Sequence, residues 1–227
     1  MAATVRKGDI SSMAQLQAGI IPVTPLQQNC TVLFDPELRE GVVVDPGGDA
    51  DVIIQTVEEN GITLKAIWLT HGHLDHAGGA MELKERLGLE IIGPHEDDRF
   101  ILENIEASAE RFGMAGMVRN CFPDRFLTEG ETVGFGDHVF EVYHTPGHAP
   151  GHVIFFNRAQ KFAHVGDVLF HGSVGRSDLP GGDHDILLAS IRDKLFPLGD
   201  DVGFICGHGP GGRIGEERRN NPFLKGL

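Results

Sequence analysis

The chain has 227 residues, of which 41% are hydrophobic and 23% charged. A chain of this length can bury a hydrophobic core as one large domain or as two small ones. Its formal net charge of -14 disfavours a nucleic-acid partner, because an acidic surface repels phosphates. No apolar run approaches the roughly 20 residues of a membrane span, and the first residues lack the apolar stretch of a signal peptide. We therefore expect a cytoplasmic protein with no membrane partner.

Strands and helices alternate in the first half of the chain. After a flexible N-terminal extension over residues 1–15, runs of β-branched and apolar residues bounded by turn residues predict strands. These strands cover residues 19–23, 31–34, 41–44 and 64–69. Helical periodicity predicts helices over residues 50–59 and 77–87. The apolar side expected for the first of these helices consists of Val52, Ile53, Ile54 and Val57.

The second half is richer in strands. An acidic helical region is expected over residues 95–111. The predicted strands that follow are residues 132–135, 139–143, 153–156, 161–165 and 202–206, and the predicted helices are residues 185–195 and 214–220. Two β-α halves of this kind predict an α/β fold in which two sheets pack face to face with helices outside. We expect residues 16–227 to form a single domain.

Side chains that bind metals gather in one short segment. Imidazole and carboxylate groups are ligands of zinc, iron and manganese. Directly after the predicted strand 64–69, four such groups fall within six positions: His71, His73, Asp75 and His76. Three more candidates each follow a predicted strand and lie beside glycine: His148, Asp167 and His208. Because one ion takes about four ligands, seven candidates favour a site for two metal ions.

The three cysteines indicate neither a disulfide framework nor a zinc knuckle. Cys30, Cys121 and Cys206 are odd in number and widely spaced, and no CxxC occurs. Cys206 lies just before the Gly207-His208 pair, where a soft metal ligand is one option. We favour the other option, in which Cys206 is a small buried apolar side chain.

These motifs resemble those of a known family. THGHLDH, TPGHAPGH, the VGD at residues 165–167 and GHGP are similar to the signature set of the metallo-β-lactamase superfamily. VDPGGDA, GRSDLPGGDH and NPFL resemble, more closely, the short single-domain bacterial branch of the glyoxalase II (hydroxyacylglutathione hydrolase) group. The resemblance runs from about residue 20 to residue 224. It implies a four-layer αββα sandwich without the separate C-terminal helical domain of the two-domain enzymes.

The resemblance also implies how the ligands divide. His71, His73 and His148 would hold the first metal, Asp75, His76 and His208 the second, and Asp167 would bridge both. Asp75 and His76 are also the predicted catalytic residues. The expected cofactors are two divalent ions, with zinc favoured and iron or manganese as alternatives.

The family activity implied is thioester hydrolysis. A metal-bridging hydroxide would cleave S-D-lactoylglutathione or a similar glutathione conjugate, and the enzyme would be a monomer or small homo-oligomer. Arg176 is the candidate contact for a substrate carboxylate, with a surface salt bridge as the alternative. Asp45 is either an orienting partner of a ligand histidine or a plain turn residue, and His152 is expected to support the site.

Other functions fit parts of the same pattern. One is a persulfide dioxygenase with a single iron, which dioxygen consumption would identify. A lactonase or β-lactamase is another, and a third is a non-catalytic metal-binding protein. The complete ligand set favours a hydrolase over this last reading.

Overall fold

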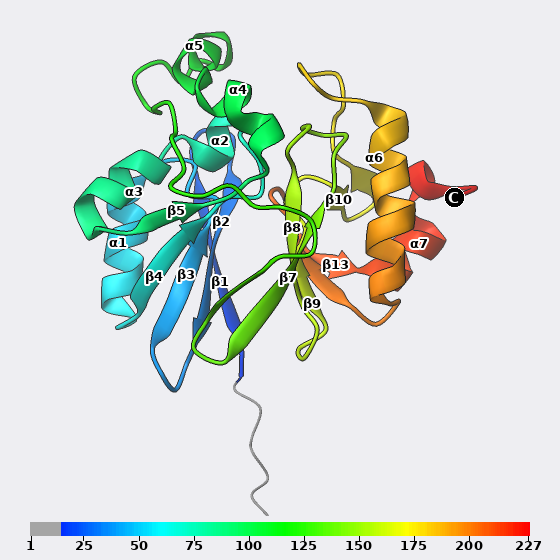
Figure 1. The fold of residues 1–227 in the computed structure, drawn as a ribbon, viewed down its shortest axis with the longest axis horizontal. Helices are drawn as coiled ribbons and strands as arrows, with labels where there is room; N and C mark the ends of the chain where they lie inside the picture. The colour runs from blue at the N-terminus through cyan, green and yellow to red at the C-terminus, as the bar shows by residue number, and fades with distance from the viewer. Residues whose placement is uncertain (1–14) are drawn as a thin grey trace, which may run out of the picture.

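The computed structural model describes residues 15–227 (Figure 1). The predicted flexible extension, residues 1–15, lies outside the described residues except for Gln15. Within residues 15–227, no helix is both long and apolar enough to cross a membrane.

The first half of the chain forms a mixed five-stranded sheet in the order β1-β2-β3-β4-β5. The strands are β1 (Gln17–Val23), β2 (Gln28–Asp35), β3 (Glu40–Val44), β4 (Thr63–Trp68) and β5 (Glu90–Ile92). Antiparallel pairing joins β1 to β2 and β2 to β3 across tight turns, whereas β3, β4 and β5 run parallel and are connected through helices. The four strands predicted in this half are confirmed, and β5 was not predicted.

Helices α1 (Ala50–Glu59), α2 (Leu74–Ala77) and α3 (Ala80–Leu87) belong to this half (Figure 1). The bounds predicted for α1 are confirmed, and its Ile53, Ile54 and Val57 are buried. The placement of Val52 on the buried side was wrong, because this side chain is 50% exposed. The helix predicted over residues 77–87 is instead two helices, since Gly79 donates its backbone N–H to the Pro46 carbonyl at 2.9 Å and leaves the helical ladder.

The second half forms a six-stranded sheet in the order β13-β12-β9-β8-β7-β6. Its strands are β6 (Thr132–Phe135), β7 (His138–His144), β8 (Val153–Asn157), β9 (Phe162–His164), β12 (Gly203–Ile205) and β13 (Gly212–Arg213). A separate short hairpin consists of β10 (Leu169–Phe170) and β11 (Ser173–Val174). All five strands predicted here are confirmed, while β10, β11 and β13 were missed.

Two further helical groups complete the fold, the first of them on the second half. The outer face of its sheet carries α6 (His184–Ser190), the π-helical turn η3 (Ile191–Leu195), η4 (Phe196–Leu198), α7 (Ile214–Asn220) and η5 (Pro222–Leu224). The acidic region predicted over residues 95–111 is helical but broken into η1 (Glu96–Asp98), α4 (Arg99–Leu102), α5 (Ile105–Ala109) and η2 (Glu110–Phe112). In Figure 1 these short helices stand at one end of the molecule.

Three hydrophobic cores define four layers. Ile53 and Leu83, from α1 and α3, pack with strand residues of the first sheet in one core. Trp68 of the first sheet packs against Phe140 and Phe155 of the second in a central core between the sheets. Leu187 of α6 belongs to a third core beneath the outer helices. The predicted αββα sandwich is therefore confirmed.

Candidate metal centre

The predicted ligands converge at one end of the two sheets. The segment His71 to His76 follows β4 and enters α2. His148 lies in the turn between β7 and β8, while Asp167 and His208 follow β9 and β12. Because β9 and β12 are parallel neighbours, their carboxyl ends bring Asp167 and His208 to the same edge.

Three histidines form the first group. The Nε2 atom of His148 lies 2.9 Å from Nδ1 of His73 and 3.3 Å from Nε2 of His71. A tetrahedral zinc ion with Zn–N bonds of about 2.0–2.1 Å holds its nitrogens roughly 3.3 Å apart. Three imidazole nitrogens at this spacing suit one metal ion, and the same three residues form a group that could hold one.

Asp75, His76 and His208 form the second group. Oδ2 of Asp75 lies 3.2 Å from Nε2 of His208 and 3.8 Å from Nε2 of His76. These donors, two imidazoles and a carboxylate, suit a divalent transition metal.

Asp167 lies between the two groups. Its Oδ1 is 3.5 Å from Nε2 of His76, and its Oδ2 is 3.5 Å from Nε2 of His148 and 3.7 Å from Nε2 of His208. Among the described residues, Asp167 Oδ1 and His76 Nε2 are buried polar atoms without a hydrogen-bond partner. Buried polar atoms rarely remain unpaired, and cations held by both groups would satisfy these two. The residues present therefore fit a two-metal centre.

A buried aspartate fixes the orientation of two of these imidazoles. Asp45 accepts a hydrogen bond from Nδ1 of His76 at 2.9 Å and from the Thr70 hydroxyl at 2.6 Å. Since the Thr70 proton is used on Asp45, Thr70 Oγ1 accepts from Nδ1 of His71 at 3.0 Å. Both imidazoles thereby keep Nε2 as the lone-pair donor that faces the centre. The orienting role considered for Asp45 is what the structure shows.

His148 and Asp167 are held in a similar way. Nδ1 of His148 donates to the backbone carbonyl of Arg176 at 2.7 Å, which leaves its Nε2 for the centre. His152 is fully buried, and its Nε2 accepts the backbone N–H of Asp167 at 3.0 Å. A side chain at Gly207 would overlap Asp167 Oδ1, so glycine is required there. His152 supports the site without joining either group, as the sequence predicted.

Burial sets the protonation of the first group. It lowers the pKa of His71 well below the ordinary value and that of His73 to about 3, and neighbouring imidazoles add to both effects. Burial also lowers the pKa of His148. These imidazoles are therefore neutral at neutral pH, which is the form that binds metals.

In the second group, the neighbouring charges outweigh the effect of burial on the pKa values. Burial opposes the charged form of His76, but the carboxylates of Asp167 and Asp75 outweigh it and raise its pKa. Burial likewise opposes ionisation of Asp167, yet His76 and the other imidazoles lower the pKa of this carboxyl. A divalent cation would displace the His76 proton, since a ligand must be deprotonated.

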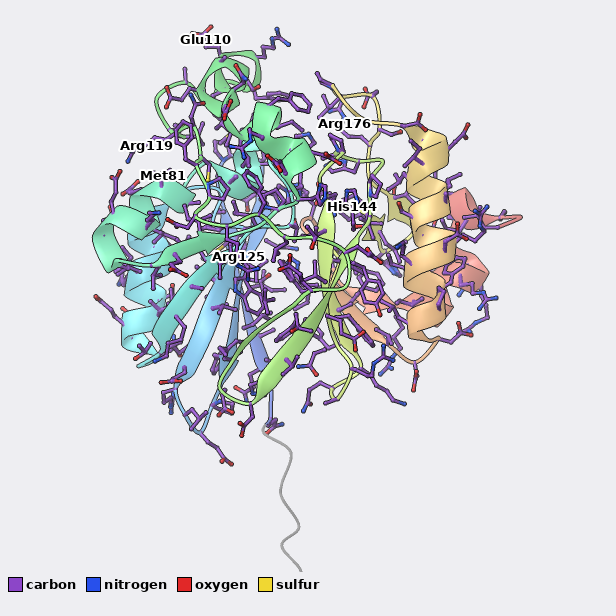
Figure 2. All side chains as sticks on the ribbon, viewed as in Figure 1. Met81, Glu110, Arg119, Arg125, His144 and Arg176 are labelled. Carbon is purple, nitrogen blue, oxygen red and sulfur yellow. The ribbon has the colours of Figure 1, made fainter. Side chains whose placement is uncertain are left out.

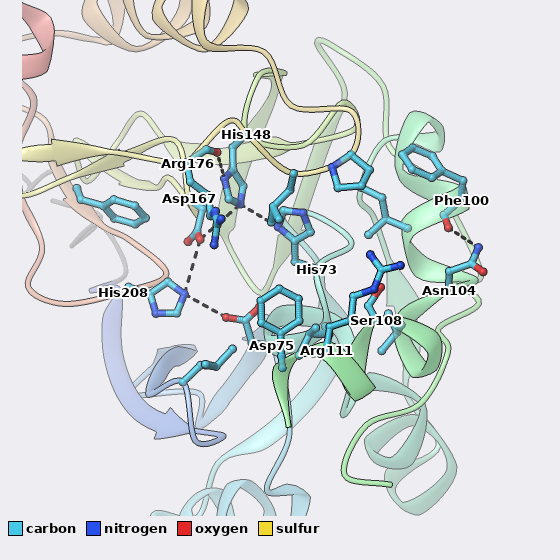
Figure 3. Close-up of a pocket in the computed structure, with 18 of the residues that line it drawn as sticks. His73, Asp75, Phe100, Asn104, Ser108, Arg111, His148, Asp167, Arg176 and His208 are labelled. Atoms are coloured by element: carbon cyan, nitrogen blue, oxygen red, sulfur yellow. Dashed lines mark hydrogen bonds and ion pairs between the residues drawn. The ribbon is translucent and has the colours of Figure 1, made fainter. Parts of the chain in front are cut away.

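A pocket of about 750 Å³ opens above the centre (Figure 3). Its floor includes His73, Asp75, His148, Asp167 and His208. Most of its walls are apolar, with side chains from α4, α5 and η2 on one side and from the segment after β9 on the other. Such a large, mostly apolar cavity over a polar floor suits a small-molecule substrate.

Arg176 lines this pocket, as expected of a substrate contact. Its guanidinium also pairs with Asp178, through bonds of 2.8 Å and 2.9 Å, and the side chain is 54% exposed. Figure 2 labels Arg176 on the side of the second sheet, opposite Glu110 at the tip of the short helices. Its role as a substrate contact stays a prediction.

The helical wall of the pocket was not predicted from the sequence. Phe100, Asn104, Ser108 and Arg111 all line it. They recur at intervals of four, four and three residues, a spacing that places side chains on one side of a helical segment. This spacing in the sequence could have indicated that the four side chains share one surface.

Cys206 is a buried structural residue. Its thiol donates to the carbonyls of His208 at 3.2 Å and Pro210 at 3.4 Å, and burial raises its pKa to about 12. Among the described residues, Cys206 is fully buried and belongs to none of the groups that could hold a metal ion, in agreement with the favoured option of a small buried side chain.

An αββα sandwich with groups able to hold two metal ions at the joined ends of its sheets is the architecture of a metallohydrolase. The family model for the metallo-β-lactamase superfamily matches residues 23–208, and the chain belongs to that superfamily. It is 48% identical to hydroxyacylglutathione hydrolase GloC of Haemophilus influenzae over 206 residues, covering 90% of this chain and 96% of the relative.

Two solved structures are similar to most of the chain. The B3 metallo-β-lactamase BLEG-1 has a TM-score of 0.86 and 38% identity, with 92% of this chain and 100% of that chain covered. A relative solved in a di-iron-bound form has a TM-score of 0.83 and 37% identity, with 91% and 100% covered. The resemblance seen in the motifs is thus confirmed at the level of the superfamily and its glyoxalase II-like relatives.

Proposed function

We propose that this enzyme hydrolyses a glutathione thioester, such as S-D-lactoylglutathione, to a hydroxy acid and glutathione. The observation that carries the proposal is the position of Asp167, whose two oxygens face two separate ligand groups on the floor of a large pocket. The similarity to GloC, which is named a hydroxyacylglutathione hydrolase, supports the choice of substrate.

The two ligand groups would each hold one ion, with Asp167 between them. Two divalent cations so placed lower the pKa of a water molecule and polarise the carbonyl of a substrate. We propose zinc as the metal. Iron takes the same ligand types, and one relative was solved with two irons.

The protonation of four groups on the pocket floor supports the proposal of a thioester substrate. The pKa values of the Asp75 and Asp167 carboxyls and of the His73 and His148 imidazoles all lie below their ordinary values. None of these four groups is therefore an acid that could protonate a leaving group at neutral pH. An alkyl thiol has a pKa of roughly 8.5, so a thiolate departs readily without such help, whereas an alkoxide and above all an amide anion are far more basic and depart much more slowly.

A substrate series with one common acyl group tests this proposal. We expect kcat/KM for the thioester to exceed that for the matched oxygen ester by orders of magnitude, and amides and β-lactams to be hardly cleaved. Comparable values for the amide would show that a general acid exists in the site. Preference for a lactone or a β-lactam over every thioester would assign the enzyme to another branch of the superfamily.

A further inference from the structure

Arg111 stands out among the arginines of this acidic protein. Between residues 15 and 227, every other arginine side chain bonds a carboxylate or a backbone carbonyl, and Arg111 alone has no partner of either kind. A cation left unpaired on a chain of net charge -14 is uncommon, because carboxylates are abundant around it. Its charge is available to a ligand.

The side chain of Arg111 faces the pocket. Arg111 belongs to η2 and lines the pocket, and Figure 3 shows its side chain extending from the helical wall into the cavity. The neighbouring lining residues on this wall include Phe100, Ile105 and Phe112. Apolar surroundings displace water, which strengthens the interaction of a guanidinium with an anion.

The size of the pocket decides which part of the substrate reaches Arg111. A lactoyl group is small and neutral, and its carbonyl must lie at the floor, among His73, Asp75 and His148. The cavity of about 750 Å³ extends well beyond such a group to the wall of α4, α5 and η2. The thiol portion of the substrate must fill that space.

We infer that Arg111 binds a carboxylate on the thiol portion of the substrate and so selects glutathione thioesters over thioesters of neutral thiols. This inference rests on the proposed function. A planar guanidinium accommodates a carboxylate through two parallel N–H···O bonds. The contact lies far from the reacting carbonyl, so it stabilises the bound substrate and the transition state equally and acts on KM.

The kinetic test compares two thioesters of D-lactate, one with glutathione and one with the uncharged thiol N-acetylcysteamine. Arg111→Gln should raise KM for the glutathione thioester roughly tenfold, as expected for loss of a charge-assisted bond, with kcat unchanged. It should leave the N-acetylcysteamine thioester unaffected. The control is Arg119→Gln. Arg119 is exposed, pairs with Glu85 and does not line the pocket (Figure 2).

A binding measurement separates this inference from the proposed function. S-methylglutathione cannot be hydrolysed, and calorimetric titration should show about tenfold weaker binding to Arg111→Gln than to the wild type or Arg119→Gln. Equal affinities, or no binding to the wild type, would overturn the role of Arg111 even if glutathione thioesters are cleaved. Conversely, weakened binding to Arg111→Gln without any thioesterase activity would leave Arg111 as an anion site and remove the proposed function.

Discussion

At the scale of single residues, the sequence predicted the candidate ligands and two of their supporting residues, Asp45 and His152, but not Thr70. His71, His73 and His76 could be recognised because four metal-binding side chains within six positions are rare. In the sequence, Thr70 looks like an ordinary strand-end residue. Only its hydrogen bonds show that it connects the Asp45 carboxylate to the His71 imidazole and so orients that ring. Such relays depend on contacts between residues 25 positions apart, which no local pattern reports.

The position of Asp167 between both groups leads to a prediction for Asp167→Asn. The amide keeps the shape of the side chain but loses the charge that faces three imidazoles. Elemental analysis should show about two metal ions per wild-type chain and a clear loss in the variant. We expect kcat/KM to fall by at least about 100-fold. Mutation of a residue that only supports a metal ligand already lowers metal affinity or activity by about 10–100-fold.

His164→Ala is the matched control for Asp167→Asn. His164 lies three residues earlier and is also fully buried, but its Nε2 contacts the Thr31 hydroxyl at 3.2 Å instead of the metal groups. The variant should keep its metal content and most of its activity at a temperature where it is folded. Equal losses in the two variants would mean that the ligand assignment around β9 is wrong.

At the scale of elements, sequence patterns located every strand of four or more residues and two of the three-residue strands, but missed β5 and all the two-residue strands. Alternation of apolar residues is readable over five or more positions. In contrast, β10, β11 and β13 have only two residues each and exist because a partner strand is near. The division between α2 and α3 has the same origin, since it depends on the bond from Gly79 to the distant Pro46.

One element joins the two loops that carry the first metal group. Asp98, at the end of η1, is fully buried and accepts the backbone N–H of Gly72 at 2.7 Å and of Gly151 at 2.5 Å. Gly72 lies between two ligand histidines, and Gly151 lies between His148 and His152. In Asp98→Asn the amide oxygen can accept only one of these bonds, so we expect a loss of about 1–3 kcal/mol in the free energy of unfolding.

The protonation of Asp98 adds a pH dependence to this prediction. Burial raises the pKa of Asp98 to about 7, and the two N–H donors only partly offset it. The folded protein therefore holds this proton more tightly than the unfolded chain does, and the contribution of Asp98 to stability falls as the pH rises from about 4 to about 7.

Urea unfolding at fixed free zinc measures this effect. The stability difference between wild type and Asp98→Asn should shrink between pH 5 and pH 8, because only the wild type carries the titrating group. Glu103→Gln, which alters an exposed carboxylate near Arg99, should follow the wild type at both values. A wild-type advantage that grows with pH would show that Asp98 is ionised throughout this range.

At the scale of the whole molecule, the alternation of strands and helices was enough to predict two sheets with helices outside. The four layers follow from where apolar residues lie: the central strands of each sheet are buried on both faces, one against helices and one against the other sheet. The helical wall of the pocket could not be placed in this way. Its exposed Phe100 and Phe112 resemble ordinary surface residues until the fold brings them opposite the second sheet.

The metal centre connects the two halves of this sandwich, which leads to a prediction about global stability. Segment His71–His76 extends from the first sheet, whereas His148, Asp167 and His208 extend from the second. Ions bound by both sides stabilise only the folded protein, because the unfolded chain separates these ligands. At a free metal concentration 1,000 times Kd, one such site contributes about 4.1 kcal/mol.

Calorimetric melting with and without a chelator measures this contribution. For a chain of this size, about 4 kcal/mol corresponds to a decrease in Tm of roughly 8–16 °C on metal removal. Restoring zinc should reverse the decrease, and the Tm should rise with zinc concentration. Asp167→Asn should show a clearly smaller shift than the wild type, because it loses the carboxylate that reaches both groups, while Arg119→Gln should keep the full shift. An identical Tm for the wild type with and without metal would show that its two halves are held by the apolar core between the sheets alone.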